Sequence, residues 1–344
     1  MKMYKVVLII LSILFLPSCL PSTQLGERAI VEAVGIDKNE GMFTVSIQYY
    51  NLENTNLKSS QNPSVTHSAK TISEAIEGIN AKISKRLYFG HNNFIAVGKS
   101  AAENDIEDVL EYFDLNPETK SDICIFVTEN AQKIISFEDE KNSLSPLSIL
   151  KVIEKSVENG SGCDYKMYTV IESNKSATSS FVLPIGKISD DKLFEIGGAY
   201  LFKNGVLVDN LNKEETRGLQ WYRGKISDFL FSTDEYDIEV TGCRTTLETY
   251  ALDELPAFKI KVSVELKRPT VILDNEEQTK EAISSQITRE IKKVISAAFT
   301  NHKCDIFQFS KYLKVKSPKF LQKTPQWYAS PSANIEVEVS CFFT

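Results

Sequence analysis

The sequence predicts an α+β protein with mixed, largely antiparallel sheets packed with helices, in two or three consecutive domains. Strands with alternating apolar residues and helices with an apolar stripe occur along the whole chain, but without the strand–helix–strand rhythm of a doubly wound sheet. The length of 344 residues suits two or three domains. A content of 42% hydrophobic and 25% charged residues is typical of a globular protein.

The first eighteen residues have the pattern of a cleaved secretory signal. Two lysines precede a short apolar run, and Leu16-Pro17-Ser18 then leads to Cys19. The run is far shorter than the roughly 20 residues of a transmembrane helix. Leu16 and Ser18 suit a bacterial lipobox, although Pro17 is unusual between them. The pattern predicts a lipoprotein signal peptide over residues 1–18 and a diacylglycerol on the Cys19 sulfur; the alternative is a plain signal peptide with an incidental cysteine.

The first half of the chain mixes predicted strands and helices. Strands are expected at Ala29–Ile36, Phe43–Tyr49, Phe94–Val97 and Asp122–Thr128, and helices at Thr71–Leu87, Asp105–Leu115 and Pro146–Val157. Asp37–Gly41 supplies the turn between the first two strands. Thr71 and Glu74 have the spacing of a capping box, and an apolar stripe follows them as far as Leu87. Glu53–Ser68 is polar and weakly patterned, which predicts a loop.

A similar pattern restarts in the second half. Strands are expected at Phe181–Ile185, Gly197–Lys203, Phe258–Leu266 and Ile335–Cys341, and helices at Thr279–Ala298 and, capped by Asp305, through Leu313. Asn204-Gly205 predicts a hairpin turn. The domain boundary is expected near Asn159–Lys192. This gives an N-terminal domain over residues 19–185, either whole or divided into two subdomains, and a C-terminal α+β domain over residues 186–344.

Charge and cysteine usage exclude several classes of function. The formal net charge of −7 argues against a general nucleic-acid binder and against a polybasic membrane anchor. Besides Cys19, five scattered cysteines without CxxC spacing predict neither a zinc site nor a disulfide framework. Cys124 and Cys341 lie in apolar stretches and are expected in the core. Cys163 follows Gly-Ser-Gly, so its exposure and its pairing with another cysteine stay open.

Motifs for catalysis are missing from the sequence. Gly98-Lys99-Ser100 ends like a phosphate-binding loop, but Asn93 stands where that loop needs a glycine, and the preceding residues look like a strand. GxSxG, HExxH and GxGxxG do not occur. His67, His91 and His302 are too dispersed to indicate a metal site. We therefore predict no catalytic residues, no metal site and no cofactor.

Three residues are candidates for a partner interface. Arg217 and Trp221 are residue types favoured at the centres of protein interfaces, although Trp221 can equally cap the core. His91 lies between a predicted helix and strand, where it can bind a partner or sense pH. The alternative for His91 is a loop histidine bonded to the backbone.

Four stretches carry a family resemblance. They are the lipobox with Glu27–Asp37, then Arg86–Gly98, then Leu183-Pro184 with Gly198–Lys203, and finally Leu211–Gly224. In this order they resemble the C subunits of bacterial spore germinant receptors, the Ger(x)C lipoproteins. The match covers most of residues 19–230 and is looser beyond them. Leu20 stands where many members have Trp, and Asn116–Glu118 lacks an expected arginine, which indicates a divergent member.

The resemblance implies a role and no reaction. Such subunits have a three-domain α+β fold, are lipid-anchored on the outer face of the spore inner membrane, and associate with the integral membrane subunits A and B. The receptor triggers germination in response to nutrients, and the family offers no catalytic site, so an enzyme is not expected. No small-molecule ligand of this chain is predicted.

The alternative is a membrane-anchored solute-binding lipoprotein that captures a nutrient itself. That class usually has two doubly wound lobes, whose rhythm this sequence lacks. A secreted enzyme has the least support, because it would need a pocket that holds His91 beside a carboxylate.

Overall fold

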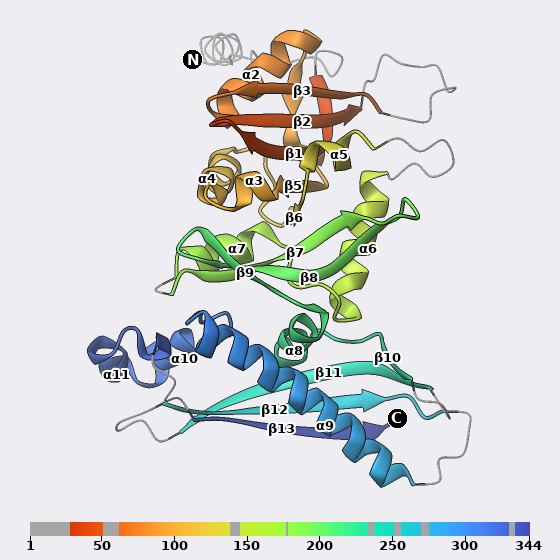
Figure 1. Ribbon diagram of the computed structural model, residues 1–344, viewed down its shortest axis with the longest axis vertical. Coiled ribbons are helices and arrows are strands. Elements are labelled where there is room, and N and C mark those ends of the chain that lie inside the picture. The colour runs from red at the N-terminus through yellow and green to blue at the C-terminus, as the bar shows by residue number, and fades with distance from the viewer. Residues whose placement is uncertain are drawn as a thin grey trace, which may run out of the picture.

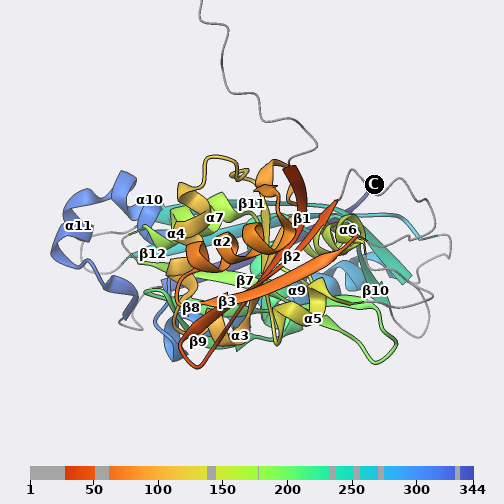
Figure 2. The same cartoon turned by 90° about the horizontal axis from the view of Figure 1, so that it is seen from above.

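The protein is an elongated stack of two sheets and their helices, shown in Figure 1 and along the stack in Figure 2. The computed structural model describes residues 28–50, 62–137, 145–176, 178–232, 237–250, 256–269, 275–329 and 334–344. Residues 1–18 and Cys19 lie outside the described residues, so the predicted signal and anchor stay predictions. Mixed sheets packed with helices confirm the predicted fold class.

The first described sheet has the strand order β3-β2-β1-β5-β6-β7-β8-β9, with β4 beside β1. Its strands are β1 (Arg28–Asn39), β2 (Met42–Tyr50), β3 (Ser64–Ala69), β4 (Arg86–Tyr88), β5 (Phe94–Gly98), β6 (Cys124–Thr128), β7 (Ser180–Ile188), β8 (Phe194–Lys203) and β9 (Val206–Leu211). The ladders β1–β2–β3 and β7–β8–β9 are antiparallel, whereas β1, β5 and β6 run parallel. A single parallel residue pair, Val127 with Ile185, joins the two halves.

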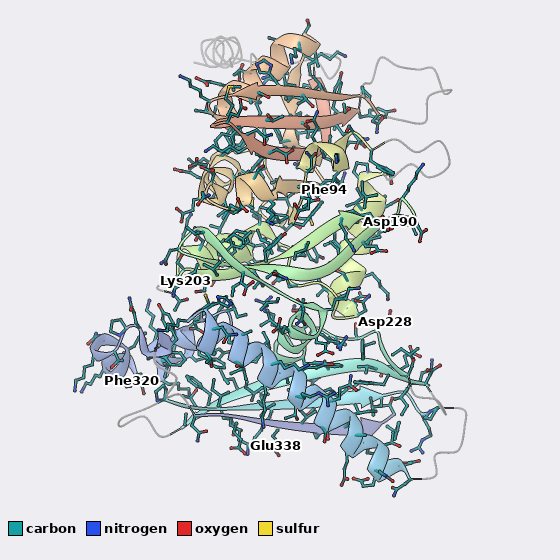
Figure 3. All side chains as sticks on the ribbon, viewed as in Figure 1. Phe94, Asp190, Lys203, Asp228, Phe320 and Glu338 are labelled. Carbon is teal, nitrogen blue, oxygen red and sulfur yellow. The ribbon has the colours of Figure 1, made fainter. Side chains whose placement is uncertain are left out.

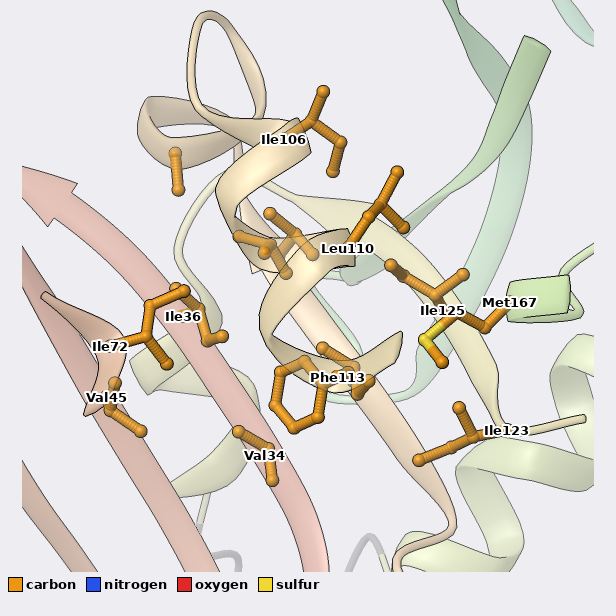
Figure 4. Close-up of a cluster of buried hydrophobic side chains, with 14 of the residues drawn as sticks. Val34, Ile36, Val45, Ile72, Ile106, Leu110, Phe113, Ile123, Ile125 and Met167 are labelled. Carbon is orange, nitrogen blue, oxygen red and sulfur yellow. The ribbon is translucent and has the colours of Figure 1, made fainter. Parts of the chain in front are cut away.

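Helices cover both faces of this sheet. They are α2 (Ile72–Ile83), α3 (Lys99–Ala102), α4 (Ile106–Leu115), α5 (Ala131–Ile135), α6 (Pro146–Glu158) and α7 (Met167–Asn174), with a short 3₁₀ helix, η2 (Phe89–His91). Alternate residues of β5 point to opposite sides: Ile95 packs in the cluster with α2 and α4, and Phe94 in the cluster with α5 and α6. Figure 4 shows the first cluster, in which Phe113 of α4 lies near Val34 of β1.

The second sheet has the order β10-β11-β12-β13. Its strands are β10 (Phe229–Ser232), β11 (Asp237–Tyr250), β12 (Ala257–Leu266) and β13 (Asn334–Phe343), and its helices are α8 (Lys213–Arg223), α9 (Glu276–Ile295), α10 (Phe309–Lys316) and α11 (Pro318–Lys323). Val337 and Val339 of the parallel edge strand β13 pack on the core beneath α9. Glu338, labelled in Figure 3, belongs to the exposed alternate set.

Two sequence expectations fail locally. Ser64–Ser68 belongs to β3 and is no loop; as an edge strand it is covered on one side only, so its sequence carries few apolar residues. Leu87 belongs to β4 and not to the helix, because Ser84 adopts a left-handed backbone (φ 53°) that ends α2. Residues 51–61 of the expected loop lie outside the described residues. The expected boundary at residue 185 falls inside β7 and stays a prediction.

Candidate functional site

Helix α8 lies at the junction between the first sheet and the second, where it packs against β8, β11 and α9 (Figure 1). It begins at a full capping box: Asn212 Oδ1 accepts from the Glu215 amide (3.0 Å), and the Glu215 carboxylate accepts from the Asn212 amide (2.9 Å). It ends at Gly224, whose left-handed φ of 62° suits glycine. Both ends of the helix are thereby fixed by its own sequence.

A buried carboxylate, Glu290 of α9, organises one face of α8. Arg217 donates to it from Nε (2.9 Å) and Nη2 (2.5 Å), and Trp221 Nε1 donates at 2.9 Å. Gln286 Nε2 donates a further bond of 3.2 Å. The Arg217 guanidinium also lies 4.6 Å from the centre of the Phe229 ring. The bidentate ion pair with Arg217 and the hydrogen bonds from Trp221 and Gln286 offset the cost of burying the Glu290 carboxylate.

Trp221 is a core residue of this cluster. Its side chain has 0% exposure, and its ring stacks on Phe231 (6.2 Å between centres) and meets the edge of Phe229 at 6.0 Å. A side chain without exposed surface cannot anchor a partner, so the placement favours the core alternative over the interface prediction for Trp221.

The other two interface candidates lie apart. The Arg217 side chain is 18% exposed and engaged with Glu290. His91 is exposed on η2, with its ring 6.2 Å from that of Tyr88, and belongs to the first sheet's helical layer. The structure does not bring His91 together with α8. For both residues a role at an interface stays a prediction.

Asp37 and Gly98, from the first two family stretches, lie in direct contact, and Asp37 and Gly35 both meet α5. Asp37, at the end of β1, accepts from the amides of Ala131 (2.9 Å) and Gln132 (2.8 Å) at the start of α5. A Cβ at Gly98 would lie 1.9 Å from Asp37 Oδ1, and one at Gly35 would lie 2.7 Å from a side-chain carbon of Ile135. Burial raises the pKa of the Asp37 carboxyl despite the two amide donors. These residues therefore fix α5 against β1 and have a structural role.

Two further residues of α8 carry buried polar atoms without partners among the described residues. Gln220 is fully buried, and neither its amide nitrogen nor its amide oxygen has a hydrogen-bond partner among the described residues. Arg223 lies three residues on, and its buried Nη1 likewise has none among them. Buried polar groups are nearly always hydrogen-bonded, so such groups point to a functional role. The family stretch Leu211–Gly224 contains both residues.

Arg223 lines a cavity of about 670 Å³ between the two sheets. Five described elements contribute its walls: α7, β7, α8, β11 and α10. The buried wall is apolar and includes Val170, Phe181, Val182, Ile306 and Phe307. The volume lies in the range of ligand pockets, which often form at such interfaces between units.

The charged residues that line the cavity are mainly basic. Arg223, Lys225, Lys311 and Lys316 line it, against a single acidic lining residue, Asp164. This excess of positive charge stands in a chain with a formal net charge of −7. A cleft lined by one sign of charge concentrates ligands of the opposite sign.

The five described cysteines are free, and Cys163 is buried. Cys124 is buried as predicted, and Cys341 is partly exposed, facing the core beneath α9. Within the described ranges no cluster of three or more metal-ligating side chains occurs. No helix among those residues is long and apolar enough to span a membrane.

The sequence patterns did not predict a cavity, nor did they single out Gln220 and Arg223 as candidate site residues. The cavity walls come from segments between residues 164 and 316, which no spacing rule connects. Only the family resemblance pointed to this region of the sequence, because the fourth stretch, Leu211–Gly224, contains Gln220 and Arg223 beside Trp221.

The chain matches known spore germination proteins along nearly its whole length. Residues 21–188 match the family described as "Spore germination protein N-terminal domain", and residues 197–342 match "Spore germination B3/ GerAC like, C-terminal". The chain is 25% identical to Spore germination protein KC of Bacillus subtilis (strain 168), over 94% of this chain and 89% of that one. The crystal structure of the GerBC protein has a similar fold, with a TM-score of 0.60 and 14% identity over 90% of this chain and 96% of that one. The chain therefore belongs to the Ger(x)C family of spore germination proteins.

Proposed function

We propose that this protein is the lipid-anchored, non-enzymatic C subunit of a spore germinant receptor. It assembles with the integral membrane subunits A and B on the outer face of the spore inner membrane, and the complex triggers germination in response to nutrients. The observation that carries the proposal is the match of both family domains across residues 21–188 and 197–342, directly after the lipobox that ends at Cys19.

Tethering by lipid is central to this proposal. A diacylglycerol on Cys19 supplies the two acyl chains that stable anchoring needs. The acidic net charge of −7 gives no electrostatic help on an anionic membrane surface. The anchor and the partner subunits together hold the folded part of the chain at the membrane.

The test is an affinity pull-down of the tagged protein from detergent-solubilised spore inner membranes, with mass spectrometry of the co-eluting proteins. We expect two polytopic membrane subunits, and their loss with Cys19→Ala. Cys341→Ala, which changes a partly exposed cysteine outside the lipobox, is the matched control and should retain both. Recovery of the protein alone, from spore and vegetative membranes alike, would contradict the proposal and favour a solute-binding lipoprotein.

A further inference from the structure

We propose that the cavity beside α8 binds a small organic anion with an apolar body, whose carboxylate or phosphate is held by Arg223. This inference goes beyond the receptor role and does not depend on assembly with membrane subunits. It follows from the volume of the cavity, from its lining and from the guanidinium of Arg223, which has no ion pair among the described residues.

Arg223 is the group that selects an anion. Arg223 lines the cavity and makes no ion pair among the described residues, and its buried Nη1 has no acceptor there, whereas Arg217 on the same helix is engaged with Glu290. A guanidinium presents its donors in a planar fork that matches a carboxylate or a phosphate. A bound anion would give the Arg223 guanidinium the charged partner that the described residues do not provide.

The lysines that line the cavity also favour an anionic ligand. Lys225 and Lys316 are exposed and have no ion pair among the described residues, while Lys311 pairs with Glu172 at 2.7 Å. Asp164 is the acidic group of the lining, and Glu172 faces outward from α7. The lysines that line the cavity therefore leave a positive field for an incoming anion.

The wall opposite the charges accepts an apolar body. Phe181, Val182 and Val170 are each 3% exposed, and Ile306 and Phe307 are 2% exposed. A ligand with an apolar portion of aromatic size can cover this wall while its charged group reaches Arg223. An inorganic anion alone would leave the wall without a contact.

The cavity is preformed by bonds across it. Gln308 Nε2 donates to Ser173 Oγ at 2.9 Å and connects α10 with α7. Tyr222 Oη donates to the Phe307 carbonyl at 2.8 Å and connects α8 with the segment before α10. Because these bonds hold the walls in place, a ligand does not have to order them when it binds.

The test uses the chain from residue 19 onward with Cys19→Ser, and benzoate, phenyl phosphate, benzyl alcohol, benzylamine and inorganic phosphate as probes. Isothermal titration calorimetry and saturation-transfer NMR measure binding. We expect binding of benzoate or phenyl phosphate, with the stronger of the two identifying the charged group, and much weaker binding of the neutral, cationic and inorganic probes. Arg223→Gln should lower affinity roughly tenfold or more, as loss of a charge-assisted bond does.

Two further variants test the role of the lining lysines and control for changes outside the lining. Lys225→Ala combined with Lys316→Ala changes exposed residues only, so it should fold and still weaken binding. Lys314→Ala, on the same helix α10 but outside the lining, is the matched control and should bind as the parent does. Equal binding of benzyl alcohol, or unchanged affinity in Arg223→Gln, would overturn the proposal.

Discussion

Gly218 on α8 lies directly against the main chain of Glu290 on α9, where an added Cβ would be 2.2 Å from the Glu290 carbonyl oxygen. The same Glu290 binds Arg217 and Trp221 through its carboxylate. The close approach of the two helices and the buried ion pair are thus one arrangement, and the family stretch around Gly218 encodes it.

Gly218→Ala should separate α8 from α9. Because the obstacle is a backbone oxygen and no flexible side chain, we expect a loss of about 1–3 kcal/mol in the free energy of unfolding, measured by urea denaturation. Gly197→Ala is the control, since its Cβ would meet only the end of the Lys213 side chain at 3.1 Å. Equal effects of the two substitutions would show that the helix contact is not the cause.

Trp221→Ala should destabilise the second sheet and not merely weaken an interface. Removing a fully buried tryptophan costs about 3–5 kcal/mol, and the change also leaves part of Glu290 without a donor. Trp221→Phe should retain most packing and lose mainly the 2.9 Å bond. Thermal unfolding followed by circular dichroism measures both. A native melting curve for Trp221→Ala, together with lost partner binding, would restore the interface prediction.

Asp37 should make stability depend on pH in the acid range. Its raised pKa means that the folded chain holds the proton at a pH where the unfolded chain, with a pKa of about 3.9, has released it. The contribution of Asp37 to the free energy of unfolding is therefore fully present below the pKa of the unfolded chain. It is lost as the pH rises through the pKa of the folded chain. Asp37→Asn removes it, so the stability of the parent relative to Asp37→Asn should fall across that window. A difference that is constant or grows with pH would contradict the assignment.

The described cysteines should resist alkylation in the folded state. Burial raises the pKa of Cys163 and of Cys243 to about 12 and that of Cys341 to about 11. At pH 8 roughly one Cys341 in a thousand is a thiolate, and only the thiolate reacts. With Cys19→Ser, iodoacetamide followed by mass spectrometry should label these residues in urea and leave them unmodified without it. Rapid native labelling of Cys163 would show that its segment opens.

Periodicity predicted the regular parts of the fold well. The alternation of Phe258–Leu266 and Ile335–Cys341 matches β12 and β13, and Asp305 accepts from the amides of Phe309 (2.9 Å) and Ser310 (2.8 Å), as expected of a residue that caps α10. Asn204-Gly205 has the left-handed backbone of the predicted hairpin turn, with φ of 49° and 73°.

Helix α8 and strand β11 escaped prediction for physical reasons. The buried face of α8 includes Thr216, Gly218 and Gln220, so the helix has no continuous apolar stripe. In β11 an irregularity between Val240 and Gly242 shifts the register and interrupts the alternation. The candidate cavity depends on both elements, and for that reason it emerged only from the structure.

The parallel pairing of β12 with β13 sets an order of assembly. The chain leaves the second sheet at Leu266, forms α9 to α11, and returns to the sheet with the ten residues of β13, Asn334–Phe343. The pairing therefore closes a long stretch of chain, and contacts between residues so far apart in the sequence form slowly in folding. Truncation within β13 would leave β12 as an unpaired edge strand, which can pair with other chains and aggregate.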